Sequence, residues 1–136
     1  MPSPLIPNLH YRDAAKAIEW LCRAFGFQQK MVVPGEDGKI IHAQLTFGEN
    51  GMVMLSSILD TKFNQFSIQP DEIQGKETQT VYVVVPDVKS HYAQATSVGT
   101  EILLELTEKD YGGADYTCRD LEGHIWTFGT YDPWKE

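Results

Sequence analysis

Hydrophobic and polar positions along the chain fall into two matching series of segments. In the first series, a short alternating run predicts a strand, apolar residues at helical spacing predict a helix, and three further runs predict strands. These segments are strand 5–11, a helix from Ala14 to Gly26 with Asp13 as its N-cap, and strands 27–33, 40–47 and 52–56. The first half of the chain is therefore predicted to have the order strand, helix, three strands.

The same order follows in the second half. It comprises strand 78–85, a helix from Val88 to Val98 with Asp87 as its N-cap, and strands 100–106, 114–120 and 124–131. The two predicted caps, Asp13 and Asp87, lie 74 residues apart, and the turn glycines Gly51 and Gly123 lie 72 residues apart. Because these two independent landmarks agree closely, they indicate an internal duplication.

A stretch without a regular period separates the two series. Loops of this length are uncommon in compact domains unless they connect subdomains or cover a site. We therefore expect one domain over residues 1–136, with a first module (1–57), a connector (58–76) and a second module (77–136). The predicted fold class is α+β. Tandem βαβββ modules would form a curved mixed sheet, with the helices outside and a concavity inside.

Composition and charge narrow the range of partners. The formal net charge is −8, from 11 basic and 19 acidic residues, and it opposes nucleic-acid binding, which needs clustered Lys and Arg. It permits cationic or neutral small molecules. No apolar run reaches the roughly 18 residues of a membrane span, so no membrane partner is expected. Cys22 and Cys118 are far apart and no signal-peptide pattern precedes them, which favours reduced thiols in the cytoplasm.

Three stretches resemble the glyoxalase / bleomycin-resistance protein / extradiol dioxygenase (vicinal oxygen chelate) superfamily. They are His10–Leu21 with Ala24–Phe27, His42–Gly48, and Arg119–Gly129. The last stretch is similar to the closing D-P-x-G-x-x-W hairpin of the family, with Leu121 where proline is common. The resemblance covers most of the chain apart from the connector. It implies the tandem-module fold, and it implies a homodimer because modules in this family commonly pair or swap across subunits.

The resemblance also implies where a metal ion would be bound. Metal-dependent members hold one divalent ion with His, Glu or Gln from the first and last strands of each module. Those positions correspond here to Ile6, Leu55, Thr80 and Thr127. Aliphatic and hydroxyl side chains do not make a site for zinc, nickel, manganese or iron. We therefore expect neither a metal ion nor another cofactor.

Strand alternation predicts which side chains line the cavity, on the premise that these four positions face it. Trp126 and Phe128 then face the helices, His124 fixes its own hairpin, and His91 on the second helix is solvated. The predicted ligand-binding residues are His10, His42, Gln44, Leu55, Thr80, Tyr82, Tyr116 and Thr127.

Three hypotheses on function follow. The leading one is a metal-independent protein that sequesters or carries an organic small molecule between the modules. The second is a metal-dependent lyase, isomerase or dioxygenase in which His10, His42 or Gln44 supply unorthodox ligands. The third is a metal-free enzyme in which His10 or His42 is the general base.

Overall fold

The computed structural model describes residues 2–135 and contains two βαβββ modules in chain order. Module 1 comprises β1 (Asn8–Tyr11), α1 (Ala14–Phe25), β2 (Gln28–Pro34), β3 (Ile40–Phe47) and β4 (Gly51–Ser57). Module 2 comprises β5 (Val81–Val84), α2 (Val88–Ser97), β6 (Glu101–Glu108), β7 (Ala114–Arg119) and β8 (Ile125–Gly129). Short 3-10 segments cover Glu36–Gly38, and Phe63–Phe66 and Pro70–Ile73 in the connector. The predicted tandem order and the α+β class are confirmed.

The helices begin where the sequence predicts. The Asp13 side chain accepts the Lys16 N–H at 3.1 Å, and Asp87 accepts the Ser90 N–H at the same distance. Gly26 ends α1 with a φ of 86°, which glycine adopts without a steric cost. Within residues 2–135, no helix is long and apolar enough to span a membrane.

The duplication extends to the register of the strands. The strand orders are β1-β4-β3-β2 and β5-β8-β7-β6, so the two sheets are equivalent. Met31 pairs with Gln44 directly after an irregularity in β2, and Leu104 pairs with Thr117 directly after an irregularity in β6. Each residue of the first pair lies 73 residues before its counterpart in the second pair. The two halves therefore share this register irregularity.

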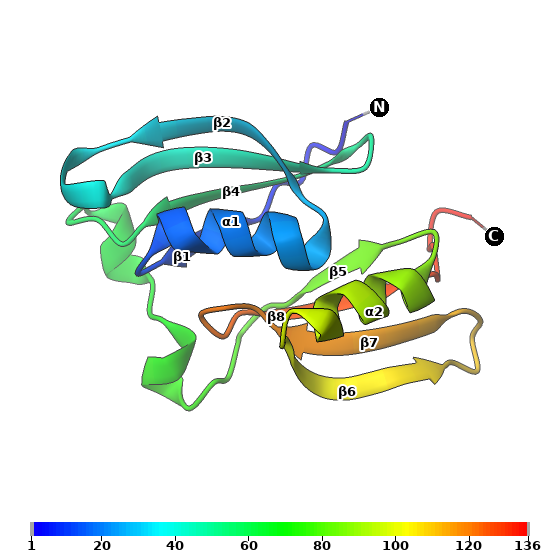
Figure 1. Cartoon of the computed structure of the whole chain (residues 1–136). Coiled ribbons are helices and arrows are strands. Elements are labelled where there is room, and N and C mark those ends of the chain that lie inside the picture. Colours follow the sequence, from blue (N-terminus) through cyan, green and yellow to red (C-terminus); the bar gives the residue numbers. More distant parts are fainter. Residues whose placement is uncertain (1, 136) are drawn as a thin grey trace.

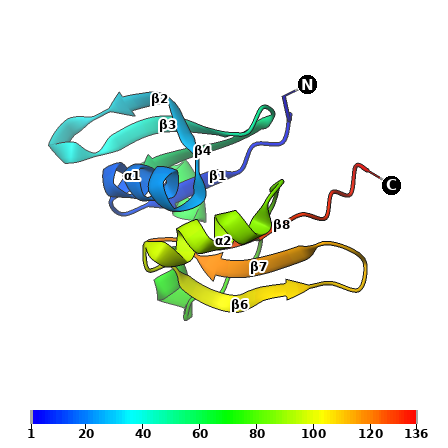
Figure 2. The same cartoon turned by 45° about the vertical axis from the view of Figure 1, so that its right-hand side comes forward.

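The strands form two separate sheets, and the helices lie between them. Both views show α1 and α2 enclosed by the sheet of module 1 on one side and the sheet of module 2 on the other (Figures 1 and 2). The two helices also contact each other. This arrangement differs from the expected single curved sheet with outer helices. Each sheet has one face against the helices and one face directed outward, which we call the outward face.

The end of α1 joins the two modules in one apolar core. The Phe25 ring is buried, and its centroid lies 5.6 Å from that of Trp126 and 4.6 Å from that of Phe128. Trp126 and Phe128 are fully buried, which confirms the prediction that they face the helices. Trp20 also contacts Phe25, at 5.0 Å between centroids. Because aromatic side chains from both modules interlock here, the modules pack as one unit.

Two sequence predictions are wrong at this junction. His91 is half-buried rather than solvated: its Nδ1 lies 2.6 Å from the Tyr116 hydroxyl, and its Nε2 lies 2.8 Å from the Phe25 carbonyl oxygen. Tyr116 is fully buried in the core and does not line a cavity. Since the carbonyl oxygen only accepts, Nε2 carries a proton, and in the neutral ring Nδ1 accepts from the tyrosine. Burial lowers the pKa of His91 and so favours this neutral form of the imidazole.

We expect His91 to make the stability of the protein fall in acid. Burial lowers the pKa of His91 below its ordinary value of 6.5, so the unfolded chain takes up this proton at a higher pH than the folded protein does. The contribution of the neutral ring is therefore complete above pH 6.5 and is lost as the pH falls through the folded pKa. Urea unfolding measured from about pH 8 to pH 5 should show a smaller pH slope for His91→Gln than for the wild type. Equal slopes would contradict this assignment.

Candidate functional site

A pocket of about 680 Å³ lies between β1 and β5, the edge strands of the two sheets, and we call it the junction pocket. This volume is typical of small-molecule sites. Three predicted ligand-binding residues, His10, Thr80 and Tyr82, line it together with Ile6. The connector contributes apolar side chains, including Phe66, to the wall. The pocket therefore combines an apolar wall with a few polar groups, as sites for organic ligands do.

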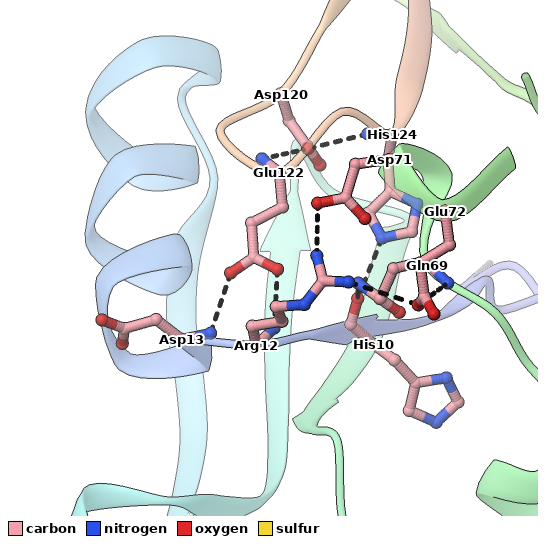
Figure 3. Close-up of polar contacts among 9 residues, drawn as sticks. All are labelled: His10, Arg12, Asp13, Gln69, Asp71, Glu72, Asp120, Glu122 and His124. Atoms are coloured by element: carbon pink, nitrogen blue, oxygen red, sulfur yellow. Dashed lines mark hydrogen bonds and ion pairs between the residues drawn. The ribbon is translucent and has the colours of Figure 1, made fainter. Parts of the chain in front are cut away.

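The turn between β7 and β8 binds the start of α1 at one end of this pocket. The Glu122 carboxylate accepts the backbone N–H groups of Arg12 at 2.6 Å and of Asp13 at 2.8 Å (Figure 3). A carboxylate at a helix N-terminus is favoured by the exposed N–H groups and by the helix dipole. Module 2 thus caps the helix of module 1.

A buried carboxylate lies beside this contact. Asp120 accepts hydrogen bonds from the Tyr11 hydroxyl at 2.5 Å and from Trp126 Nε1 at 3.0 Å. It also accepts the backbone N–H groups of Glu122 and His124, both at 3.0 Å. Burial and the neighbouring Asp120 carboxylate raise the pKa of the Tyr11 phenol well above its usual value, so Tyr11 remains a donor. One side chain therefore joins β1, the closing turn and β8.

The His124 ring contacts both β1 and Glu77, which line the junction pocket. Its Nε2 donates to the backbone oxygen of His10 at 2.9 Å, and its Nδ1 lies 3.4 Å from Glu77 Oε1. The His124 backbone N–H bonds Asp120 within the hairpin that His124 is expected to fix, and its ring extends beyond that hairpin to β1. The His10 ring points away from this contact (Figure 3), and its centroid lies 5.8 Å from that of Phe63. Burial, and next the neighbouring His124, lower the pKa of His10.

Sequence reasoning missed Glu77. Its side chain is 17% exposed, and burial raises the pKa of its carboxyl group. Glu77 lies at the boundary between connector and second module, where no motif or period marks it. The one sequence feature that could have pointed to Glu77 is its position directly after the predicted connector, which ends at residue 76.

Three other predicted residues, His42, Gln44 and Thr127, lie on the outward faces. The His42 and Gln44 side chains meet at 3.1 Å on the sheet of module 1, and Thr127 bonds Thr117 at 2.8 Å on the sheet of module 2. Each outward face has a central row of four paired residues. The rows are Met31, Gln44, Met54 and Asn8 in module 1, and Leu104, Thr117, Thr127 and Tyr82 in module 2.

The register corrects one ligand-binding prediction. Leu55 is fully buried against the helices, so it does not line a cavity. Met54 pairs with Gln44 in the way that Thr127 pairs with Thr117, and Met54 is therefore the true counterpart of Thr127. The prediction was off by one residue, which reverses the face.

The corrected set does not fit a divalent metal ion. Ile6, Met54, Thr80 and Thr127 together supply no carboxylate, imidazole or thiolate. Across residues 2–135, no group of three His, Cys, Asp or Glu side chains is placed to hold a metal ion.

Sequence comparison finds similar proteins over most of the chain. The sequence model of the Glyoxalase/Bleomycin resistance protein/Dioxygenase superfamily matches residues 7–128. The uncharacterized protein Rv0887c of Mycobacterium tuberculosis (strain ATCC 25618 / H37Rv) is 32% identical over 126 residues, which make up 92% of this chain and 72% of that protein.

Solved structures give the same result. TioX from Micromonospora sp. ML1 is 31% identical with a TM-score of 0.69, covering 93% of this chain and 97% of TioX. A FosX mutant from Listeria monocytogenes, solved with Mn(II) and 1S,2S-dihydroxypropylphosphonic acid, is 12% identical with a TM-score of 0.69, covering 98% of this chain and 94% of FosX. Glyoxalase I from Zea mays is 17% identical with a TM-score of 0.70, covering 93% of this chain and 44% of that enzyme. The last two similarities concern the fold alone.

Proposed function

This chain belongs to the Glyoxalase/Bleomycin resistance protein/Dioxygenase superfamily, and from that premise we propose that it binds an organic small molecule in the junction pocket without a metal ion. The observation that carries the proposal is the pocket itself. It has about 680 Å³ and an apolar wall with a few polar groups between the two modules. The side chains at the family's metal positions, Ile6, Met54, Thr80 and Thr127, favour this reading over a metal-dependent lyase, isomerase or dioxygenase.

A large side chain that fills the junction pocket should weaken ligand binding. We expect the neutral fluorescent probe N-phenyl-1-naphthylamine to bind the wild type and to bind Thr80→Trp at least about tenfold more weakly, because the indole would occupy the space beside His10. Thr96→Trp is the matched control, since Thr96 is exposed on α2 and far from the pocket lining. Chelation with EDTA should leave all titrations unchanged. Equal loss of binding in both variants, or loss of binding on chelation, would contradict the proposal.

The proposal includes a homodimer in the cytoplasm. Support for the dimer comes from the outward faces, where Leu104 on the edge strand β6 is 62% exposed and Met31 on the edge strand β2 is 47% exposed. A second copy that covers these faces would remove the apolar side chains from water. The free thiols of Cys22 and Cys118 agree with a reducing compartment.

A charge on the outward face of module 2, at Leu104 of β6, should prevent this association. We expect a dimeric mass for the wild type and a monomeric mass for Leu104→Lys in sedimentation velocity, because a lysine would be buried against an apolar partner surface. Thr96→Lys, which adds the same charge to an exposed helix position, should remain dimeric. A monomeric wild type would remove the dimer from the proposal and leave the pocket intact.

A further inference from the structure

The junction pocket contains one formally charged side chain among the described residues that line it, and that side chain is Glu77. Its carboxylate is largely withdrawn from water. A carboxylate in such a position is costly unless a partner compensates the lost hydration. The ring of His124 contacts it, with Nδ1 3.4 Å from Oε1.

The hydrogen bond on the other side of the ring fixes what His124 offers to the pocket. Nε2 faces the carbonyl oxygen of His10 at 2.9 Å, and a carbonyl oxygen only accepts. Nε2 therefore carries a hydrogen, and Nδ1 presents a lone pair whenever the ring is neutral. Glu77 Oε1 and His124 Nδ1 are then two acceptors 3.4 Å apart. Two acceptors at this distance repel each other unless a proton or a donor group lies between them.

We propose that this pair receives the primary ammonium group of an organic amine, with one N–H donated to Glu77 and another to His124 Nδ1. The proposal rests on the proposed function, because it names the ligand class of the same pocket. An ammonium group satisfies both acceptors and neutralises the carboxylate. The apolar part of the amine packs against Ile6 and against Phe66, which is 87% exposed at the wall.

The arrangement predicts a definite order of affinities. A primary amine has both the charge and the N–H groups that the pair requires. A quaternary ammonium has the charge but no N–H, and a neutral alcohol has no charge. A charge-assisted hydrogen bond is about twice as strong as a neutral one, so each change should weaken binding measurably.

The test uses three probes of the same size class: 2-phenylethylamine, its N,N,N-trimethyl derivative and 2-phenylethanol. In calorimetric titrations of the full chain, we expect the amine to bind at least about tenfold more tightly than either analogue. Glu77→Gln should abolish this preference while 2-phenylethanol binds as before. Glu105→Gln, which removes the same charge from an exposed position on β6, should keep the preference.

The outcomes separate this inference from the proposed function. Equal affinities for the amine and the trimethyl derivative in the wild type would overturn the two-acceptor site without reliance on any variant. Equal effects of Glu77→Gln and Glu105→Gln would reduce it to a general charge effect and also overturn it. If N-phenyl-1-naphthylamine and 2-phenylethanol bind but the amine binds no more tightly than 2-phenylethanol, this inference fails and the proposed function is retained. If none of the probes binds, both fail.

Discussion

Replacement of Asp120 by alanine is expected to lower the free energy of unfolding by about 3–5 kcal/mol. The carboxylate is buried and accepts hydrogen bonds from the Tyr11 hydroxyl and Trp126 Nε1, which belong to different modules. Without Asp120 both donors stay in the core with no acceptor, and each orphaned donor costs about 1–3 kcal/mol. The closing turn also loses the acceptor of its backbone N–H groups. A loss of this size is a large part of the total stability of a domain.

Urea unfolding of Asp120→Ala beside Asp110→Ala tests this expectation. Asp110 is exposed in the turn between β6 and β7, so its replacement should change the free energy of unfolding by no more than about 0.5 kcal/mol. Asp120→Asn should lie between the two, because an amide keeps one acceptor oxygen but adds a donor. A similar stability for Asp120→Ala and Asp110→Ala would show that the network does not hold the modules together.

Replacement of Phe25 by alanine should lower the free energy of unfolding by about 3–5 kcal/mol relative to the wild type. Phe25 lies at the end of α1, and its ring contacts Trp20 in its own module and Trp126 and Phe128 in the other. Removal of the ring leaves a cavity at the point where the two modules meet. Neighbouring aromatic rings fill such a cavity poorly because their own positions are fixed by packing.

Phe66→Ala provides the matched control for Phe25→Ala. The chemical change is the same, but Phe66 is 87% exposed in the connector, so its loss removes little buried surface. We expect its denaturation midpoint to stay close to that of the wild type, whereas that of Phe25→Ala should shift strongly. Equal shifts would mean that the aromatic contacts between modules contribute no more than a surface contact does.

Most of the fold was predictable from periodicity and caps, but one strand shows where this reasoning fails. In the run Met52–Leu55 every residue is apolar, so a period of two gives no contrast between the faces. The alignment therefore placed Leu55 rather than Met54 on the open face. The prediction that Tyr116 lines the cavity failed for another reason, because a tyrosine fits a pocket wall as well as a core position. Its hydrogen bond to His91 decides for the core.

The site was predictable only in part. Thr80 was identified from the family resemblance, and His10 and Tyr82 from strand parity relative to it. All three line one pocket. The role of His124 was not identified, because it depends on contacts with Glu77 and with the backbone of His10, far away along the chain. Pairwise contacts of this kind arise from the packing of the two modules. No local pattern in either segment encodes that packing.

The shared register of the two sheets bears on the symmetry of the ligand. A protein descended from two identical halves first presents two identical faces, and such a protein suits a molecule with its own two-fold axis. Buried positions have kept their apolar character in both halves, for example Leu55 and its counterpart Phe128. The open positions have diverged in all four pairs: Met31 and Leu104, Gln44 and Thr117, Met54 and Thr127, Asn8 and Tyr82. A molecule held against both faces would therefore meet different side chains at its two ends.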